Sequence, residues 1–374
     1  MLLSGNVSCY AVPERKRGFS AQTEDGMAVR WALVGYGGMG AWHVEKLRTL
    51  PEFEIAGIYD IKPERVQAAR ADGLKAYESL DALFRDDGVE LVTLAIPNDL
   101  HMDIAIRAMQ AGKHVVSEKP VALSSRELQR MIDASRDTGR LFTVHQNRRW
   151  DEDFLIVKKL FREGALGRTF NIESRVHGSR GVPGDWRNTF RQGGGMVLDW
   201  GVHLIDQMLQ MVEEDVVSTF ATVSHVTNDE VDDGFKAIFT FAGGLTFHVE
   251  VGTSNFVSLP RWYAQGENGT AIVEDWSPSG RIVMVSDWEK RDAVPVVTAA
   301  GLTKTMAPRT EETIKTYPLP RVESDVRDFY RNVYRAIRGE EKQLVTHAQL
   351  MRVMRLMEAV FRSAERNEVV HARI

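Results

Sequence analysis

Short apolar runs alternate with stretches of helical periodicity between Arg30 and about His145. Such runs are typical of buried strands, and apolar residues three to four apart are typical of amphipathic helices. The predicted strands are residues 31–34, 53–59, 89–96, 114–117 and 141–145. The predicted helices are residues 41–50, 63–71, 79–84, 99–110 and 125–137. Asn98 and either Ser124 or Ser125 are the expected N-caps. This alternation predicts an α/β fold, a doubly wound parallel sheet with helices on both faces.

The pattern changes after residue 148, where closely spaced strands replace the alternation. Helices are predicted at 151–163 and 196–211, and strands at 169–177, 216–226, 235–241, 245–253, 262–266 and 270–274. Hairpin signals between these strands predict a mainly antiparallel sheet. Residues 287–316 are expected to be loop, and amphipathic helices are expected at 324–338 and 347–365. We therefore divide the chain into an arm (1–28), a first domain (29–148) and a second domain (149–374), with the two last helices able to pack back on the first domain.

A glycine-rich turn follows the first predicted strand, with the sequence Gly35-Tyr36-Gly37-Gly38-Met39-Gly40. The first glycine permits a tight turn, Gly37 lets the backbone approach a pyrophosphate, and Gly40 lets helix and strand pack closely. A helix N-terminus after such a turn favours an anion. The context predicts a dinucleotide-binding Rossmann unit; the alternative is a structural turn in another α/β protein.

Asp60 ends the second predicted strand, twenty residues after the turn. A carboxylate there can accept both ribose hydroxyls of NAD and would repel the 2′-phosphate of NADP. Lys62 and Arg65 follow closely and could soften that repulsion. We expect NAD as cofactor, with NADP the less favoured alternative.

Two further groups of residues are candidates for chemistry. Glu118-Lys119-Pro120 follows a predicted parallel strand, at the edge of the sheet where ligands bind. The Lys119 ammonium could relay a proton or stabilise an alkoxide, or it could be a surface lysine in a turn. Asp199 and His203 are four residues apart in a predicted helix, so a carboxylate could support a basic imidazole. The alternative is a structural Asp–His pair.

Composition and charge narrow the class of protein. The chain has 374 residues, 43% of them hydrophobic and 26% charged, as in ordinary soluble globular proteins. Its net charge of −5 argues against nucleic acid or an anionic membrane as the main partner. The single cysteine, Cys9, allows no intrachain disulfide, and we expect a cytoplasmic protein. Near His203, neither paired cysteines nor a His-x-x-x-His motif supports a metal site.

The motifs together resemble those of the glucose–fructose oxidoreductase/inositol dehydrogenase/MocA (Gfo/Idh/MocA) family. The matching motifs are the glycine turn, Pro97-Asn98-x-x-His101, Ala111-Gly112-Lys113-His114-Val115, Glu118-Lys119-Pro120, and Gly193-Gly194-Gly195 with Asp199-x-x-x-His203. The resemblance implies a Rossmann domain followed by an α/β domain on an open-faced, mainly antiparallel sheet. It also implies a homodimer or homotetramer formed through that sheet, and hydride transfer between a sugar or polyol alcohol and a nicotinamide.

The resemblance also implies roles for individual residues. Lys119, Asp199 and His203 become the catalytic residues, with Asp199 supporting His203. The implied cofactor contacts are the glycine turn, Asp60, Ile96, Pro97, Asn98, His101, Glu118, Lys119, Gln146 and Asn147. The implied substrate contacts are the three catalytic residues with Arg148, Trp150, Trp186, Arg187 and Trp200. Trp186, Arg187 and Trp200 could equally be packing residues.

Two other functions on the same scaffold stay open, and so does the subfamily. The segment Asn147-Arg148-Arg149-Trp150 resembles scyllo-inositol dehydrogenase-like members, which often prefer NADP, in tension with Asp60. A glycoside-cleaving enzyme could use bound NAD for a transient oxidation. A sugar or NAD sensor would not need all three catalytic residues.

Overall fold

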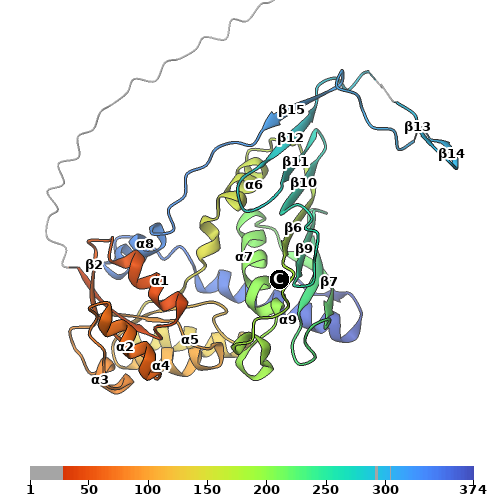
Figure 1. Cartoon of the computed structure of the whole chain (residues 1–374). Coiled ribbons are helices and arrows are strands. Elements are labelled where there is room, and N and C mark those ends of the chain that lie inside the picture. The colour runs from red at the N-terminus through yellow and green to blue at the C-terminus, as the bar shows by residue number, and fades with distance from the viewer. Residues whose placement is uncertain (1–27, 291–293, 304) are drawn as a thin grey trace, which may run out of the picture.

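A computed structural model describes residues 28–290, 294–303 and 305–374 of the chain. These residues form two sheet-containing domains that lie side by side and are joined by helices (Figure 1). The arm expected for residues 1–28 lies, except for Ala28, outside the described residues. Within the part of the chain that is described, no helix is both long and apolar enough to cross a bilayer.

The first domain is a five-stranded parallel sheet in the order β2-β1-β3-β4-β5. Its strands are β1 (Val29–Val34), β2 (Phe53–Tyr59), β3 (Leu91–Leu94), β4 (His114–Ser117) and β5 (Phe142–Val144). Its helices are α1 (Gly38–Leu47), α2 (Pro63–Ala71), α3 (Leu80–Phe84), α4 (His101–Gln110) and α5 (Ser125–Thr138). The predicted Rossmann topology is confirmed. The winding reverses between β1 and β3, and ligands of such sheets bind at the carboxyl ends of the strands beside this point.

Local side-chain caps begin some of the helices, such as α3 and α5, but not α4. The Ser124 hydroxyl accepts the Glu127 N–H at the start of α5, and Gly139 ends that helix in the left-handed region at φ 66°. The predicted Asn98 cap of α4 is wrong. Asn98 lies in a 3-10 turn, and its side-chain amide donates to the Gly193 carbonyl oxygen at 3.1 Å. The Asn98 side chain therefore binds a carbonyl 95 residues away and does not cap the helix that follows it.

The second domain is built on a nine-stranded sheet in the order β15-β12-β11-β10-β6-β9-β8-β7-β16. Its strands are β6 (Thr169–His177), β7 (Val216–Ser224), β8 (Gly234–Phe241), β9 (Thr246–Gly252), β10 (Trp262–Gly266), β11 (Gly269–Val273), β12 (Gly280–Val285), β15 (Ile314–Pro318) and β16 (Val370–His371). Neighbouring strands are antiparallel except β6 and β9. The helices α6 (Glu152–Arg162), α7 (Val202–Met211) and α9 (His347–Arg366) lie beside the sheet (Figure 1). The predicted antiparallel character is confirmed.

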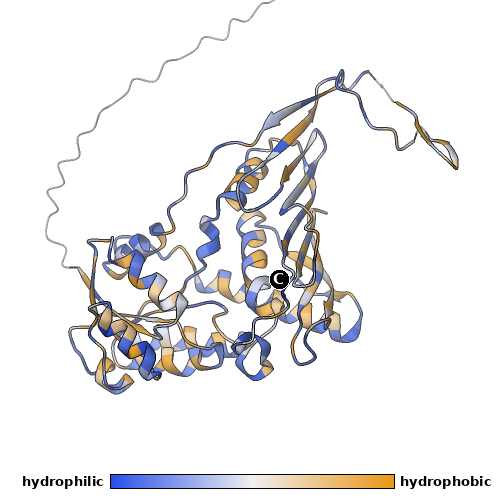
Figure 2. Ribbon diagram, viewed as in Figure 1, coloured by the Kyte–Doolittle hydropathy of each residue, from blue (hydrophilic) through white to orange (hydrophobic). Residues whose placement is uncertain are grey.

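The region after residue 274 contains more strand than the sequence pattern predicts. β12 was not expected, and the predicted loop 287–316 holds the start of β15 and a hairpin of β13 (Val296–Thr298) and β14 (Gly301–Thr303). The hairpin projects from the domain, and Figure 2 shows hydrophobic residues along it. Its strand residues are largely exposed, so the buried apolar alternation that identifies other strands is missing.

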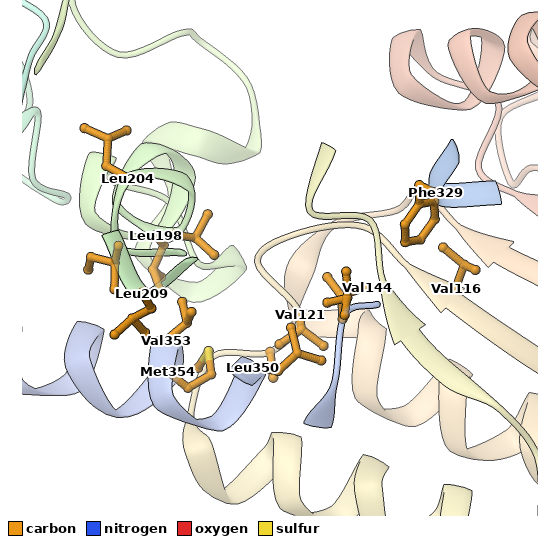
Figure 3. Close-up of a cluster of buried hydrophobic side chains, with 14 of the residues drawn as sticks. Val116, Val121, Val144, Leu198, Leu204, Leu209, Phe329, Leu350, Val353 and Met354 are labelled. Carbon is orange, nitrogen blue, oxygen red and sulfur yellow. The ribbon is translucent and has the colours of Figure 1, made fainter. Parts of the chain in front are cut away.

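Helices at the C-terminus join the two domains. Buried side chains of the parallel sheet, of the segment that carries α7, and of α9 lie in one cluster (Figure 3). The helix α8 (Asp328–Ile337) packs on the first domain, where Tyr330 meets Phe53 at 5.9 Å between ring centroids and Arg338 pairs with Glu90 at 2.9 Å. The end of the chain therefore helps to hold the parallel sheet against the second domain.

Candidate active site

The glycine turn after β1 can be built only with glycine at two of its positions. Gly35 has φ 93°, and a Cβ there would lie 2.3 Å from the Ala95 carbonyl oxygen. A Cβ on Gly40 would lie 2.1 Å from the Gly35 carbonyl oxygen. A Cβ on Gly37 or Gly38 would meet nothing within 4 Å. The turn is tight on its protein side and open where a ligand would approach.

The N-terminus of α1 has the features of an anion-binding site. Gly37 is the N-cap, without a side-chain hydrogen bond, and the first turn contains no acidic residue. Its N–H groups are therefore not capped by this chain, and the helix dipole favours negative charge there. These features fit the pyrophosphate of a dinucleotide. Tyr36 lies just before α1, and Met39 lies in the first turn of that helix.

Asp60 lies directly against this turn. One carboxylate oxygen accepts the Tyr36 N–H at 2.7 Å, and the other accepts the Lys62 N–H at 2.8 Å. Each oxygen keeps a free lone pair for a ribose hydroxyl. The Tyr36 hydroxyl is hydrogen-bonded to Asp72, and burial together with that carboxylate raises the pKa of Tyr36 to about 12.

The loop after β3, with Ile96 and Pro97, is held by two buried side chains. Asn98 ties it to the Gly193 carbonyl. His101 lies between the carbonyl oxygens of Ile96 (2.9 Å) and Pro120 (3.0 Å). Burial lowers the pKa of His101, so the neutral ring donates to one carbonyl and lies against the other. Both side chains, expected as cofactor contacts, are engaged with the protein and support the loops.

Buried acceptors without partners lie at the carboxyl end of β5. Gln146 Oε1 and Asn147 Oδ1 are buried and make no hydrogen bond within the described chain. Such atoms cost free energy unless they find a donor. Together with the open glycine turn they fit a bound nicotinamide nucleotide.

Lys119 follows β4, and its ammonium reaches the second domain. Nζ lies 2.9 Å from Asp199 Oδ1 and 2.9 Å from the Asp199 carbonyl oxygen. The Lys119–Pro120 peptide bond is cis. Glu118 Oε1 accepts from His43 and His145, and Oε2 accepts the Lys119 N–H. The Glu118 carboxylate is buried and supports the loop.

The prediction that the Asp199 carboxylate contacts and supports His203 is wrong. Asp199 Oδ1 accepts from Lys119, and Oδ2 accepts from Arg187 Nε at 3.0 Å. His203 Nδ1 is buried without a hydrogen-bond partner in the described chain. Asp199 lies in a π-helical turn (Val197–Gly201) that leads into α7, so the two side chains are neighbours. Lys119 and Arg187, which come from other segments, bind the Asp199 carboxylate that helical spacing had paired with His203.

The protonation states of this pair follow from burial and charge. Burial alone would raise the pKa of Asp199, but Lys119 and Arg187 outweigh it and hold that pKa below its usual range. Burial lowers the pKa of His203 well below its usual value, and the charges of Lys119 and Arg148 add to this. Asp199 is therefore an anion and His203 a neutral proton acceptor at neutral pH.

Aromatic rings and arginines lie beside the imidazole. The ring centroids of Trp200 and His203 lie 5.8 Å apart. The Arg148 guanidinium carbon lies 4.3 Å from the centre of the Trp200 ring. Arg148 also lies over Trp276 at 5.0 Å. Trp276 is 46% exposed and comes from the turn between β11 and β12, where no sequence motif indicated it.

The remaining candidate substrate residues lie in two places. The Arg187 guanidinium lies 4.3 Å from the centre of the Trp186 ring and reaches Asp199 from the loop before the π-helical turn. Trp150 packs on Phe329 of α8 at 6.0 Å, in the contact between domains. Arg187 thus contacts Asp199 beside Lys119, whereas Trp150 packs against Phe329.

Comparisons with known proteins agree with this geometry. The family model "Oxidoreductase family, NAD-binding Rossmann fold" matches residues 29–146, and the model "GFO/IDH/MocA C-terminal domain" matches residues 154–272. The chain belongs to the Gfo/Idh/MocA family of oxidoreductases. As a member, it has an NAD(P)-binding Rossmann domain.

Several relatives of this Gfo/Idh/MocA protein span nearly its whole length. The scyllo-inositol 2-dehydrogenase (NADP(+)) IolW of Bacillus subtilis is 28% identical over 91% of this chain and 95% of its own. The crystal structure of an NAD-binding protein from Listeria innocua is 45% identical, covers 92% of this chain and 100% of its own, and gives a TM-score of 0.90. The WlbA dehydrogenase of Bordetella pertussis, solved with NADH and UDP-GlcNAcA, is 23% identical over 93% of this chain and 100% of its own, with a TM-score of 0.74, and shows the same fold.

Proposed function

We propose that this protein is an NAD-dependent dehydrogenase that transfers hydride between a secondary alcohol of a sugar or polyol and the nicotinamide. The observation that carries the proposal is the meeting of three groups at the carboxyl edge of the parallel sheet: the Lys119 ammonium, the Asp199 carboxylate and the neutral imidazole of His203. Bound nicotinamide supplies the hydride acceptor in oxidation. The side chains of this chain handle the proton and the charge on oxygen.

Each side chain has a distinct task in alcohol oxidation. Asp199 fixes the Lys119 ammonium by contacts of 2.9 Å from both its side chain and its carbonyl oxygen. Arg187 pairs with Asp199 and also with Asp185, so the positive and negative charges of the group balance. The Lys119 ammonium, held in place by Asp199, can donate a hydrogen bond to a developing alkoxide. His203, neutral and lacking a partner on Nδ1, accepts the hydroxyl proton.

The surroundings of His203 favour a ring with many hydroxyls as substrate. Trp200 and Trp276 offer aromatic faces for C–H surfaces, while Arg148 and Arg187 offer N–H donors for hydroxyls. Each arginine already has a carboxylate partner: Arg148 pairs with Asp151 at 2.9 Å, and Arg187 pairs with Asp199. This pairing favours a neutral polyol over an acid. The name of the Bacillus subtilis relative, a scyllo-inositol dehydrogenase, supports the same class.

The position of Asp60 supports NAD as the cofactor. Its carboxylate is fixed at the glycine turn by two backbone N–H groups, where it would meet the 2′-phosphate of NADP. The relative IolW is named as an NADP(+) enzyme, so its name favours NADP whereas the charge of Asp60 favours NAD. We favour the charge argument because it concerns a residue of this chain at a known position.

We also propose that copies of this chain associate through the outer face of the nine-stranded sheet. A row of partly exposed side chains crosses neighbouring strands there, and it consists of Ile238, His248, Glu173, Tyr263 and Ile272. Light scattering of the purified protein tests this association. A dimer or tetramer that Ile238→Glu dissociates supports it, and a monomer refutes it.

The experiment for the proposed activity is NADH formation, followed by absorbance, with a panel of inositols, aldoses, gluconate and simple glycosides. We expect turnover of one polyol or sugar with NAD, and a loss of at least about 100-fold in Lys119→Met and in His203→Asn. Arg130→Met, at the surface of α5, is the control and should retain activity. Release of an aglycone without net NADH would replace this proposal with glycoside cleavage.

A further inference from the structure

A buried polar cluster lies behind Lys119 and takes no part in the chemistry described above. It consists of His43 on α1, Glu118 after β4, His145 after β5, and Tyr330 on α8. None of the four residues is more than 6% exposed. Glu118 Oε1 lies 2.8 Å from His43 Nε2 and 2.8 Å from His145 Nδ1, and the Tyr330 hydroxyl is hydrogen-bonded to His43 Nδ1.

The donors and acceptors of the cluster can be assigned from chemistry alone. An ionised carboxylate only accepts, so His43 Nε2 and His145 Nδ1 must both carry hydrogen. A neutral His43 then has no hydrogen on Nδ1, and the Tyr330 hydroxyl must donate to it. Burial alone would raise the pKa of Glu118, but His145 and His43 hold it well below its usual range. Burial lowers the pKa of His43 and, with the charge of Glu118, raises that of Tyr330, so both are neutral.

The cluster ends on the backbone of the proposed catalytic lysine. The second oxygen of Glu118, Oε2, accepts the Lys119 N–H at 3.1 Å. A continuous set of hydrogen bonds therefore runs from Tyr330 through His43 and Glu118 to the peptide of Lys119. On the other side of the loop, His101 lies 3.0 Å from the Pro120 carbonyl oxygen. Buried hydrogen bonds of this kind fix a loop because an unmade one leaves a desolvated polar group.

We propose that Tyr330 is a positioning residue for Lys119, and that it acts through His43 and Glu118. Helix α8 thus takes part in the active site although it follows Lys119 by more than 200 residues. When the helix is docked, the Tyr330 hydroxyl donates to His43 Nδ1 and so fixes the ring that donates to the Glu118 carboxylate. The inference rests on the proposed catalytic role of Lys119.

A metal centre is the competing explanation of the same cluster, because His43, Glu118 and His145 place three possible ligand atoms within 4.8 Å of one another. Two observations favour the hydrogen-bonded network. The 2.8 Å separations are ordinary hydrogen-bond lengths, and a cation at Glu118 would need both facing nitrogens without hydrogen. The network also uses the Tyr330 hydroxyl.

The test compares Tyr330→Phe with Tyr334→Phe on the same helix, using the full chain and the substrate that the panel identifies. Tyr334 packs on Phe53 and is not part of the network, so it is the matched control. We expect Tyr330→Phe to lower kcat about 10-fold per NAD-binding site, with the Kd for NAD unchanged within about twofold. Tyr334→Phe should leave kcat unchanged. Equal kcat in the two variants would overturn the inference.

A double-mutant cycle separates positioning from a general loss of stability. Glu118→Gln keeps the shape of the side chain but places an amide NH₂ against a donor. If Tyr330 acts through Glu118, the double variant will lose no more kcat than Glu118→Gln alone, and additive losses would contradict the chain of contacts. Glu118→Gln alone, with reduced kcat and unchanged NAD affinity, tests the chain if Tyr330→Phe does not fold.

Three outcomes decide between the network, a metal site and the proposed function itself. One equivalent of bound zinc or another divalent metal in the purified protein, with activity lost on its removal, would replace the network with a metal site. Full activity of Lys119→Met would refute the proposed function itself. Full activity of Tyr330→Phe beside an inactive Lys119→Met would refute only the positioning role.

Discussion

Two neighbouring aspartates, Asp232 and Asp233, are buried before β8 and have opposite shifts in pKa. They allow a quantitative test of how the segment that carries Asp199 is held. Asp232 Oδ2 accepts the Val197 N–H at 2.8 Å, at the start of the π-helical turn that carries Asp199. Its carbonyl oxygen accepts the Met196 N–H at 3.0 Å. Burial raises the pKa of Asp232 to about 6, although these N–H groups oppose the shift.

The sign of the effect on stability follows from linkage. A carboxyl whose folded pKa is raised above its unfolded value of 3.8 stabilises the fold when protonated, and this contribution is lost as pH rises through about 6. The difference of about two pKa units corresponds to about 3 kcal/mol. Asp232→Asn stays neutral at every pH, and its amide oxygen can still accept from Val197. Relative to wild type, the variant should therefore gain up to about 3 kcal/mol in free energy of unfolding between pH 4 and pH 7.

Asp233→Asn is the matched control because the neighbouring carboxyl shifts the other way. Burial would raise the pKa of Asp233, but the N–H of Thr227 and the hydroxyls of Ser224 and Thr227 outweigh it and lower that pKa. Its stabilisation is present above pH 3.8 and lost as pH falls through the folded pKa. Asp233→Asn should therefore be less stable than wild type at pH 7, by a margin that stays nearly constant down to about pH 4 and shrinks only below pH 3.8.

The assay is urea unfolding followed by tryptophan fluorescence at half-unit steps from pH 4 to pH 7, for wild type and both variants. The expected result is a difference for Asp232→Asn that grows from pH 4 to pH 7, beside a difference for Asp233→Asn that stays nearly constant. A difference for Asp232→Asn that stays constant across this range would refute the raised pKa of that carboxyl.

Three other predictions concern the substrate, the cofactor and the contact between domains. Trp276→Ala should raise KM for the polyol about 10-fold while Trp276→Phe preserves it, and an unchanged KM in initial-rate assays would place the ring outside the site. Asp60→Ala should raise the ratio of kcat/KM with NADP to that with NAD at least about 10-fold, because the repulsive charge is gone; an unchanged ratio would contradict the NAD assignment. Asp206→Asn should lower the free energy of unfolding by about 3 kcal/mol, because it leaves the buried Arg149 charge without its carboxylate partner at 2.6 Å. An unfolding curve that matches wild type would contradict this.

The parts of this protein that could be predicted from sequence are those set by neighbours along the chain. The glycine turn is one case, because a Cβ on Gly40 would meet the Gly35 carbonyl oxygen within the turn itself. The cap at Ser124 is another, since its partner is three residues away. The strand β15 escaped prediction because its residues are largely exposed, whereas β12 was missed although its Ile282 is buried.

The contacts that complete the candidate site are long-range, and no local pattern encodes them. Asp199 was matched with His203 by helical spacing, yet Lys119 occupies its carboxylate from 80 residues away. Tyr330 reaches His43 across 287 residues. Trp276 lies in a hairpin turn without any motif, and only the fold brings it to Trp200. Which residue types belong to the site could be inferred from sequence, whereas their partners could not.

The most direct test of the account is the fate of the carbinol hydrogen. The polyol identified by the panel, deuterated at its carbinol carbons, is incubated with NAD and the purified protein, and the reduced cofactor is analysed by mass spectrometry. The account predicts that the reduced cofactor gains one deuterium, and that Lys119→Met and His203→Asn form almost none of it. Product formed with deuterium lost to solvent, or with no reduced cofactor, would contradict hydride transfer at this site.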